Sequence, residues 1–138
     1  LYLNKVQSNE CIDSKIIYYL ELFSIKDYKD MLICKLSKGT KQKIVLIQAL
    51  FCNCDIYIFD EPTRGIDVNA KAEFYKQMSK LTAQGKCIIM ISSDMPELIS
   101  MSDRVLVIRD GAIDGELTGK DINEQEIIKR ALGVKKHE

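Results

Sequence analysis

The sequence predicts a layered α/β fold built on a parallel sheet. Two short apolar runs, 56–59 and 87–91, are rich in β-branched and aromatic residues, as strands buried on both faces are. Between the two runs, Phe74, Met78 and Leu81 recur at helical spacing. A strand, a helix and a second strand in this order form the unit from which parallel sheets are built. We therefore expect a parallel sheet with flanking helices.

The composition is that of a globular chain with a real core. The 138 residues include 20 basic and 20 acidic ones, so the formal net charge is zero, and no block of like charge suggests a nucleic-acid partner. No apolar run approaches the roughly 20 residues that a membrane span needs. The five cysteines form no zinc-binding pattern, which favours reduced cysteines in a cytosolic protein. Because the chain begins with Leu1, we expect it to be a piece of something longer.

The amino-terminal part is expected to be helical. Apolar residues recur at helical spacing in a first segment, at Ile12, Ile16, Tyr19, Leu20 and Phe23. Residues 24–35 are expected to connect this helix to a second one, which begins after Ser37 at the N-cap position and runs to about Phe51. Gly39 lets the backbone come close to a ligand, and a helix N-terminus is an anion site. A plainly capped helix explains the same residues.

The carboxyl-terminal part alternates helices and strands. Asp67 is expected to cap a helix that runs to about Ala83, with Gly85 in its C-terminal turn. Further local signals place the remaining elements: Pro96 in the first turn of a short helix, Asp110-Gly111 in a hairpin between strands at 105–108 and 112–117, Asn123 with Glu126 as a capping box, and Gly133 at the end of a last helix.

Two adjacent carboxylates are the strongest sign of chemistry. Asp60 and Glu61 follow the first strand, and Pro62 stops that strand from pairing further. The carboxyl ends of the strands are where open α/β sheets bind ligands. There an Asp can hold Mg²⁺ directly or through water, and a Glu can orient or deprotonate an attacking water. The alternative is that Asp60 and Glu61 are merely solvated acids at a strand end, and the surrounding sequence must distinguish the two interpretations.

Four segments together resemble the ATPases of ATP-binding cassette (ABC) proteins. LSKGTKQ, residues 36–42, resembles the signature motif, and CDIYIFDEP, residues 54–62, resembles Walker B with its catalytic glutamate. RGID, residues 64–67, resembles the D-loop, and ISSD, residues 91–94, stands where the switch loop follows the next strand. The segments TRGIDVNAKAEFY and MISSDMPELISMSDRVLVIRDGAIDGEL are similar to the second cassette of sugar-import ATPases of the ribose, galactose and xylose type.

The resemblance implies a fold and a set of site residues. The fold is a P-loop NTPase-like ABC cassette, of which 1–138 is a partial nucleotide-binding domain: about 1–52 carries the helical and signature part, and about 53–138 carries Walker B, D-loop and switch loop, then a hairpin and a helix. ATP and Mg²⁺ are the implied cofactors. The implied roles are Mg²⁺ binding through water by Asp60, catalysis by Glu61 with Ser93 at the switch position, and nucleotide binding by Ser37, Lys38, Gly39, Thr40, Gln42 and Asp67.

Three departures from the family pattern qualify these roles. Lys38 stands where the signature carries Gly, and Ser93 stands where most ABC ATPases carry a switch His. No G-x-x-x-x-G-K-[ST] occurs, so we expect that this stretch cannot hold ATP tightly alone and that the phosphate loop lies upstream.

The resemblance also implies partners. ATP would lie between this cassette and a partner cassette, either upstream in the same full-length chain or in a homodimer. Hydrolysis would open a membrane permease for a monosaccharide, with a periplasmic or extracellular sugar-binding protein as an indirect partner and no nucleic acid. The ATPase would sit peripherally on the cytoplasmic face of the plasma (inner) membrane. Two alternatives remain: a degenerate, non-hydrolysing cassette that completes the partner's site, and a DNA-repair or chromosome-structuring ATPase head, which the absence of a heptad run disfavours.

Overall fold

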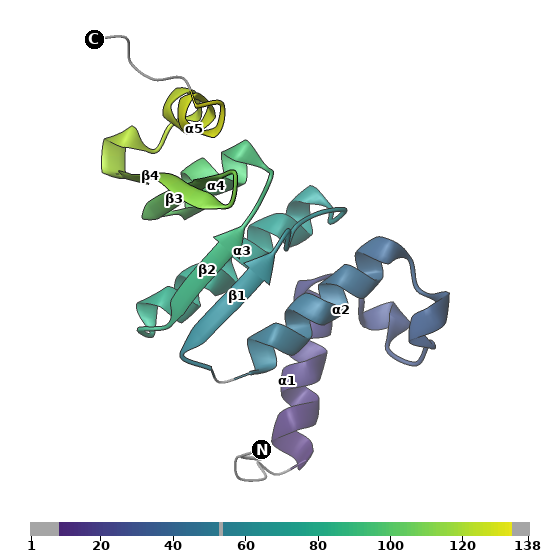
Figure 1. The fold of residues 1–138 in the computed structure, drawn as a ribbon. Coiled ribbons are helices and arrows are strands. Elements are labelled where there is room, and N and C mark those ends of the chain that lie inside the picture. The colour runs from purple at the N-terminus through teal and green to yellow at the C-terminus, as the bar shows by residue number, and fades with distance from the viewer. Residues whose placement is uncertain (1–8, 53, 134–138) are drawn as a thin grey trace, which may run out of the picture. The chain divides into compact units, whose positions relative to one another are not determined.

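The computed structural model describes residues 9–52 and 54–133 (Figure 1). The chain divides by packing into two compact units, one up to Ile91 and one from Ser92 onward. The division near residue 52 that the sequence predicts is based on the motifs that each part carries, not on packing, and it stays a prediction. Each unit is described by itself.

The first unit holds the predicted helices and the parallel strands. Its elements are α1 (Asn9–Leu22), the 3₁₀ helices η1 (Lys26–Tyr28) and η2 (Ile33–Lys35), α2 (Lys38–Phe51), β1 (Ile56–Asp60), α3 (Val68–Ala83) and β2 (Cys87–Ile91). The predicted caps are confirmed, because Ser37 accepts a hydrogen bond from the Thr40 N–H and Asp67 accepts one from the Ala70 N–H. Gly85 follows α3 with a φ of 81°, as a C-terminal turn requires.

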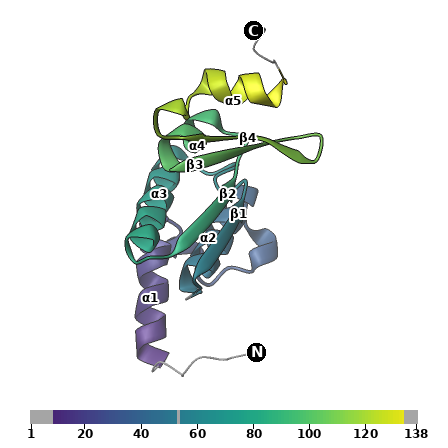
Figure 2. The same ribbon diagram turned by 60° about the vertical axis from the view of Figure 1, so that its left-hand side comes forward.

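Strands β1 and β2 pair in parallel, as predicted, in a register that runs from Ile56 opposite Cys87 to Asp60 opposite Ile91. Helix α3 runs along one face of the pair in both ribbon views (Figures 1 and 2). On that face the Phe59 and Phe74 rings meet edge to face, with centroids 5.1 Å apart, and Phe74 is fully buried. This register brings the carboxyl ends of both strands to one edge.

The opposite face of the strand pair is open, which the sequence did not predict. Ile58 is 68% exposed, and its neighbours Ile56, Ile89 and Ile91 are exposed as well. Only alternate residues of β1 are buried, because no described element of the first unit covers this second face. We name this surface the isoleucine face.

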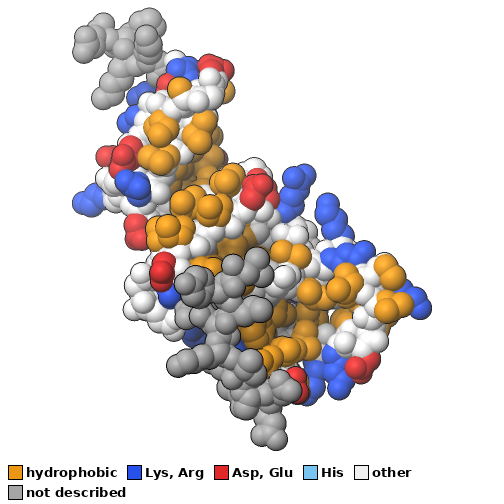
Figure 3. Space-filling view, turned by 60° about the horizontal axis from the view of Figure 1, so that its bottom comes forward, with side chains coloured by type: hydrophobic (Ala, Val, Ile, Leu, Met, Phe, Trp, Pro, Cys, Tyr) orange, Lys and Arg blue, Asp and Glu red, His pale blue; other side chains and the backbone are white. Residues whose placement is uncertain are grey.

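The connection between α1 and α2 is also apolar on its outside. Met31, Leu32 and Ile33 are exposed. Exposed hydrophobic side chains are also numerous on the face of the molecule that Figure 3 displays. A cavity of about 390 Å³ lies among α1, the connection and α2, with Ile16, Leu20 and Ile44 in its lining. None of the predicted site residues lines this cavity, so it is not the candidate site.

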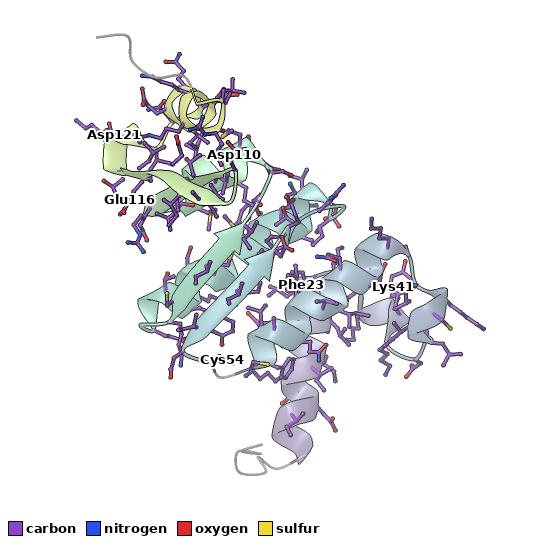
Figure 4. The ribbon with its side chains drawn as sticks, in the orientation of Figure 1. Phe23, Lys41, Cys54, Asp110, Glu116 and Asp121 are labelled. Atoms are coloured by element: carbon purple, nitrogen blue, oxygen red, sulfur yellow. The ribbon has the colours of Figure 1, made fainter. Side chains whose placement is uncertain are left out.

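The second unit packs a hairpin against a helix. Its elements are α4 (Met95–Met101), β3 (Arg104–Arg109), β4 (Ala112–Thr118), the 3₁₀ helix η3 (Gly119–Asp121) and α5 (Glu124–Ala131). The predicted hairpin is confirmed: β3 and β4 are antiparallel, and both Asp110, labelled in Figure 4, and Gly111 have positive φ. A small core forms beneath it from Val105, Val107, Leu117, Ile122 and Ile127.

Candidate functional site

The two predicted carboxylates lie at a sharp turn after β1. Asp60 is the last residue of the strand and is exposed, while Glu61 takes a left-handed conformation with a φ of 46°. The Glu61 N–H donates to the Ile91 carbonyl oxygen at 2.8 Å, which fixes the turn to the end of β2. A left-handed residue other than glycine is uncommon and costs about 1–3 kcal/mol, and such strain gathers at functional sites. The backbone therefore bends sharply at Glu61, directly after Asp60.

The segment after Glu61, residues 62–67, is tightly folded. Pro62 and Thr63 are buried, and the Ile66 N–H donates to the Thr63 carbonyl oxygen at 3.2 Å. Gly65 has a φ of 77°, a conformation that favours glycine. We refer to this segment as the 62–67 loop. It carries the chain from the carboxylates to Asp67, which caps α3.

The signature-like residues lie at the N-terminus of α2. Ser37 Oγ accepts from the Thr40 N–H at 3.1 Å and lies 2.8 Å from Thr40 Oγ1. Lys38 is exposed in the first turn. The cap explains why Ser37 and Thr40 occur here, and the first turn still presents N–H groups that an anion can bind. Both interpretations of this helix start therefore fit the structure.

The N-terminal half of α2 and the 62–67 loop are joined by three contacts. Gln42 Nε2 donates to the Pro62 carbonyl oxygen at 3.3 Å. A Cβ on Gly39 would lie 2.8 Å from the Gly65 carbonyl oxygen, so only glycine fits there without a shift. Lys43 Nζ lies 2.6 Å from Asp67 Oδ2. The structure thus brings the predicted nucleotide-site residues of this helix start into one block with Asp67.

Sequence reasoning missed Lys43. Its side chain is buried on the face of α2 that also carries Leu46, Ile47 and Leu50. A lysine among apolar residues at helical spacing was the available signal. The hydrogen bond from Lys43, followed by the one from the Ala70 N–H, lowers the pKa of the Asp67 carboxyl. Asp67 is therefore held as an anion beside a cation.

The switch-like residue Ser93 is described with the second unit, whereas Asp60 and Glu61 belong to the first. Its neighbours form a half-buried cluster: Ser92 Oγ bonds to Glu97 Oε2 and accepts from the Asp94 N–H at 3.0 Å. Asp94 caps α4 by accepting from the Glu97 N–H at 3.2 Å. Glu97 is only 2% exposed, and its Oε1 has no hydrogen-bond partner within the described part of the chain. Sequence reasoning missed Glu97, although Asp94 and Glu97 have capping-box spacing.

The residue at this edge that could hold a magnesium ion is Asp60. Among residues 9–52 and 54–133, no group of three or more His, Cys, Asp or Glu side chains could hold a metal ion. Mg²⁺ usually keeps several waters and takes one or two carboxylates together with phosphate oxygens. The exposed carboxylate of Asp60 at a strand end fits that mode of binding.

The same described residues contain no helix that is long and apolar enough to cross a membrane.

Comparison with known proteins adds the family. A model of the family "ABC transporter" matches residues 3–64. The chain is 44% identical over 139 residues to the ribose import ATP-binding protein RbsA of Clostridium perfringens (strain 13 / Type A), covering 96% of this chain and 27% of that protein. It is 50% identical over 100 residues to the galactose/methyl galactoside import ATP-binding protein MglA 1 of Photobacterium profundum, covering 72% of this chain and 20% of that protein.

Solved structures agree on the fold. An ATP-binding subunit of an ABC transporter superposes with a TM-score of 0.76 at 23% identity, covering 92% of this chain and 50% of that one. A dimeric ATP-binding cassette in a post-hydrolysis state, bound to ADP and Pi, gives a TM-score of 0.73 at 20% identity, covering 83% and 50%. The predicted cassette fold is thereby confirmed.

The chain spans about a quarter of the length of the curated relatives that it matches, and half the length of the similar cassettes. Within that span the signature-like helix start, the carboxylate turn and the 62–67 loop occur in one continuous stretch. The relatives are named as ribose and galactose import proteins, and the chain belongs to their family, the ABC transporter ATP-binding proteins.

Proposed function

We propose that this chain is the carboxyl-terminal part of a cassette that couples ATP hydrolysis to the uptake of a monosaccharide through a membrane permease. The observation that carries the proposal is the carboxylate turn, in which Glu61 is held at a φ of 46° beside Asp60 at the sheet edge. The names of the relatives, which are ribose and galactose importers, support the substrate class.

In the site on its own cassette, the chain supplies the acidic residues. Asp60 would hold Mg²⁺ through a water, and the ion, when bound, neutralises charge on the phosphates. Glu61 would accept a hydrogen bond from the attacking water and take its proton. Ser93 would offer one neutral hydrogen bond to the γ-phosphate. The phosphate-binding loop would come from a preceding segment of the same cassette.

In the opposite site, the chain supplies the start of α2. Ser37, Lys38, Gly39 and Thr40 would meet the γ-phosphate of ATP held by a partner cassette, with Gln42 and Asp67 behind them. The partner is a second cassette in the same full-length chain or a second copy. The similarity to cassettes solved as dimers supports this arrangement. The assembly would lie on the cytoplasmic face of the plasma (inner) membrane, against the permease, with the sugar-binding protein on the far side.

Glu61→Gln in the full-length protein tests the proposal. The amide keeps the shape of the side chain but loses the charge that polarises water, so turnover at this site should fall by about 10²–10³ while ATP still binds. Glu73→Gln, on the outside of α3, is the matched control and should leave turnover unchanged, because Glu73 forms a surface ion pair with the exposed Lys76.

A non-hydrolysing cassette that completes the partner's site is the second candidate. It is favoured by Ser93, which lacks the positive charge that an imidazolium can supply, and by Lys38 in place of glycine. With the partner's site silenced, a Glu61→Gln protein that turns over ATP as fast as its parent would contradict hydrolysis at this site and favour this second candidate.

A further inference from the structure

Lys43 is a buried lysine whose ammonium group joins three segments of the first unit. It extends from α2, where its residue is 9% exposed. Its Nζ lies 2.6 Å from Asp67 Oδ2 in the 62–67 loop. The same Nζ donates to the carbonyl oxygen of Phe23 at 3.0 Å. Phe23, labelled in Figure 4, directly follows α1 and is itself buried.

Packing alone does not account for a charge at this position. Leu46, Ile47 and Leu50 fill the same face of α2 with apolar side chains, and an apolar residue at 43 would extend that core. Burying an ammonium group is costly unless it is paired and hydrogen-bonded, and such pairs are often no more stable than apolar replacements. An ammonium group, unlike an apolar side chain, fixes the positions of the two oxygen atoms that it binds, Asp67 Oδ2 and the Phe23 carbonyl oxygen.

Two residues of α2 near Lys43 also contact the 62–67 loop. Gln42 holds the Pro62 carbonyl oxygen at the beginning of the loop. Gly39 allows the Gly65 backbone to approach α2 in the middle of the loop. Lys43 holds Asp67 at its end. The 62–67 loop is therefore attached along its whole length to the first two turns of α2.

We propose that Lys43 is a positioning residue that locks the 62–67 loop to α2 and so sets the spacing between the two half-sites that this chain supplies. Glu61, directly before the loop, serves the site on its own cassette, and Ser37, the N-cap of α2, serves the opposite one. This proposal rests on the proposed function, because the proposed function assigns Glu61 and Ser37 to the two ATP sites. Lys43 touches neither nucleotide and acts through Asp67.

The test measures ATP turnover and ATP binding in the full-length protein. Lys43→Met keeps an unbranched apolar chain of nearly the same length and removes the ammonium group. We expect kcat to fall by about 10²-fold, the effect of a small misplacement of reacting groups, while the Kd for ATP stays that of the parent. Lys43→Arg, which can bond to both oxygen atoms, should restore most of kcat. Lys76→Met, which breaks an exposed ion pair on α3, is the matched control and should change neither value.

A double-variant cycle tests whether Lys43 acts through Asp67. The amide oxygen of Asp67→Asn can still accept from the Ala70 N–H, so the cap of α3 persists and this variant should fold even if Lys43→Met does not. We expect Asp67→Asn to lower kcat as well, and Lys43→Met with Asp67→Asn to lower it no further than the worse single change.

Three results would overturn the proposal: parental kcat in Lys43→Met, a failure of Lys43→Arg to restore kcat in a folded protein, or additive losses in the cycle. Turnover of the Glu61→Gln protein shows whether the positioning role of Lys43 or the proposed function is wrong. If Glu61→Gln abolishes turnover and Lys43→Met leaves it intact, only the positioning role is wrong. If Glu61→Gln has no effect, the proposed function is wrong.

Discussion

Replacing Gly39 by alanine distinguishes a packing role for this glycine from a role in phosphate binding alone. In the middle of a helical turn, alanine is favoured over glycine by about 1 kcal/mol, so a purely ligand-facing glycine should gain stability on this change. The structure predicts the opposite sign, because the new methyl group would meet the backbone of the 62–67 loop.

The magnitude follows from the contact. The added Cβ would lie 2.8 Å from the Gly65 carbonyl oxygen, well inside the 3.4 Å at which ordinary contact begins. The oxygen belongs to backbone with a φ of 77°, so it cannot rotate away as a side chain would. Overpacking of this kind costs about 1–3 kcal/mol. After the gain in helix propensity is subtracted, we expect a net loss of up to about 2 kcal/mol.

Thermal unfolding of the full-length protein measures this loss. A loss of this size should lower Tm by up to about 8 °C for a domain of cassette size. Lys38→Ala is the matched control for stability, since it places alanine at the neighbouring exposed position and should change stability by less than about 0.5 kcal/mol. A Gly39→Ala protein with a Tm at or above that of its parent would refute the packing argument.

Three further predictions concern titration and the switch segment. The fold lowers the pKa of Asp67 from its ordinary value of 3.8, so the ionised carboxylate stabilises the fold above pH 3.8, and this stabilisation is lost as the pH falls through the lowered pKa. The difference in Tm between the parent and Asp67→Asn should therefore shrink below pH 3.8. A difference in Tm that stays constant with pH would contradict this prediction. Ser93→His, with the partner's site silenced, should raise turnover by about 10²–10³, since it restores a charged donor; unchanged turnover would show that Ser93 does not limit the rate. Glu97→Leu should destabilise by about 1–3 kcal/mol in a melting experiment because Ser92 loses its acceptor, whereas Glu97→Gln should stay near the parent.

Local chemistry accounts for what the sequence could predict. The apolar run before Asp60, the caps at Ser37 and Asp67, and the Asp110-Gly111 turn each depend on a few neighbouring residues, and each occurs in the structure as predicted. The order of four motif-like segments then indicated the family. These features need no knowledge of what lies opposite them.

The features that were missed depend on residues distant in the sequence. The partners of Lys43, Phe23 and Asp67, lie 20 and 24 positions away, so helical periodicity could mark the lysine as unusual but could not name what it binds. The left-handed conformation of Glu61 was not predicted, because the hydrogen bond that holds it goes to Ile91 on the neighbouring strand. Burial of both faces of β1 was inferred from its apolar run, whereas the described residues cover only one face.

The isoleucine face has a practical consequence for any preparation of this 138-residue chain. Within the described part of the chain β1 and β2 form a two-stranded sheet, so each strand has an unpaired edge beside exposed isoleucines. An unprotected edge with an apolar flank is a template on which another copy can add a strand. We expect self-association that grows with concentration, and a lysine at position 58 or 89 should suppress it without disturbing the face that packs on α3.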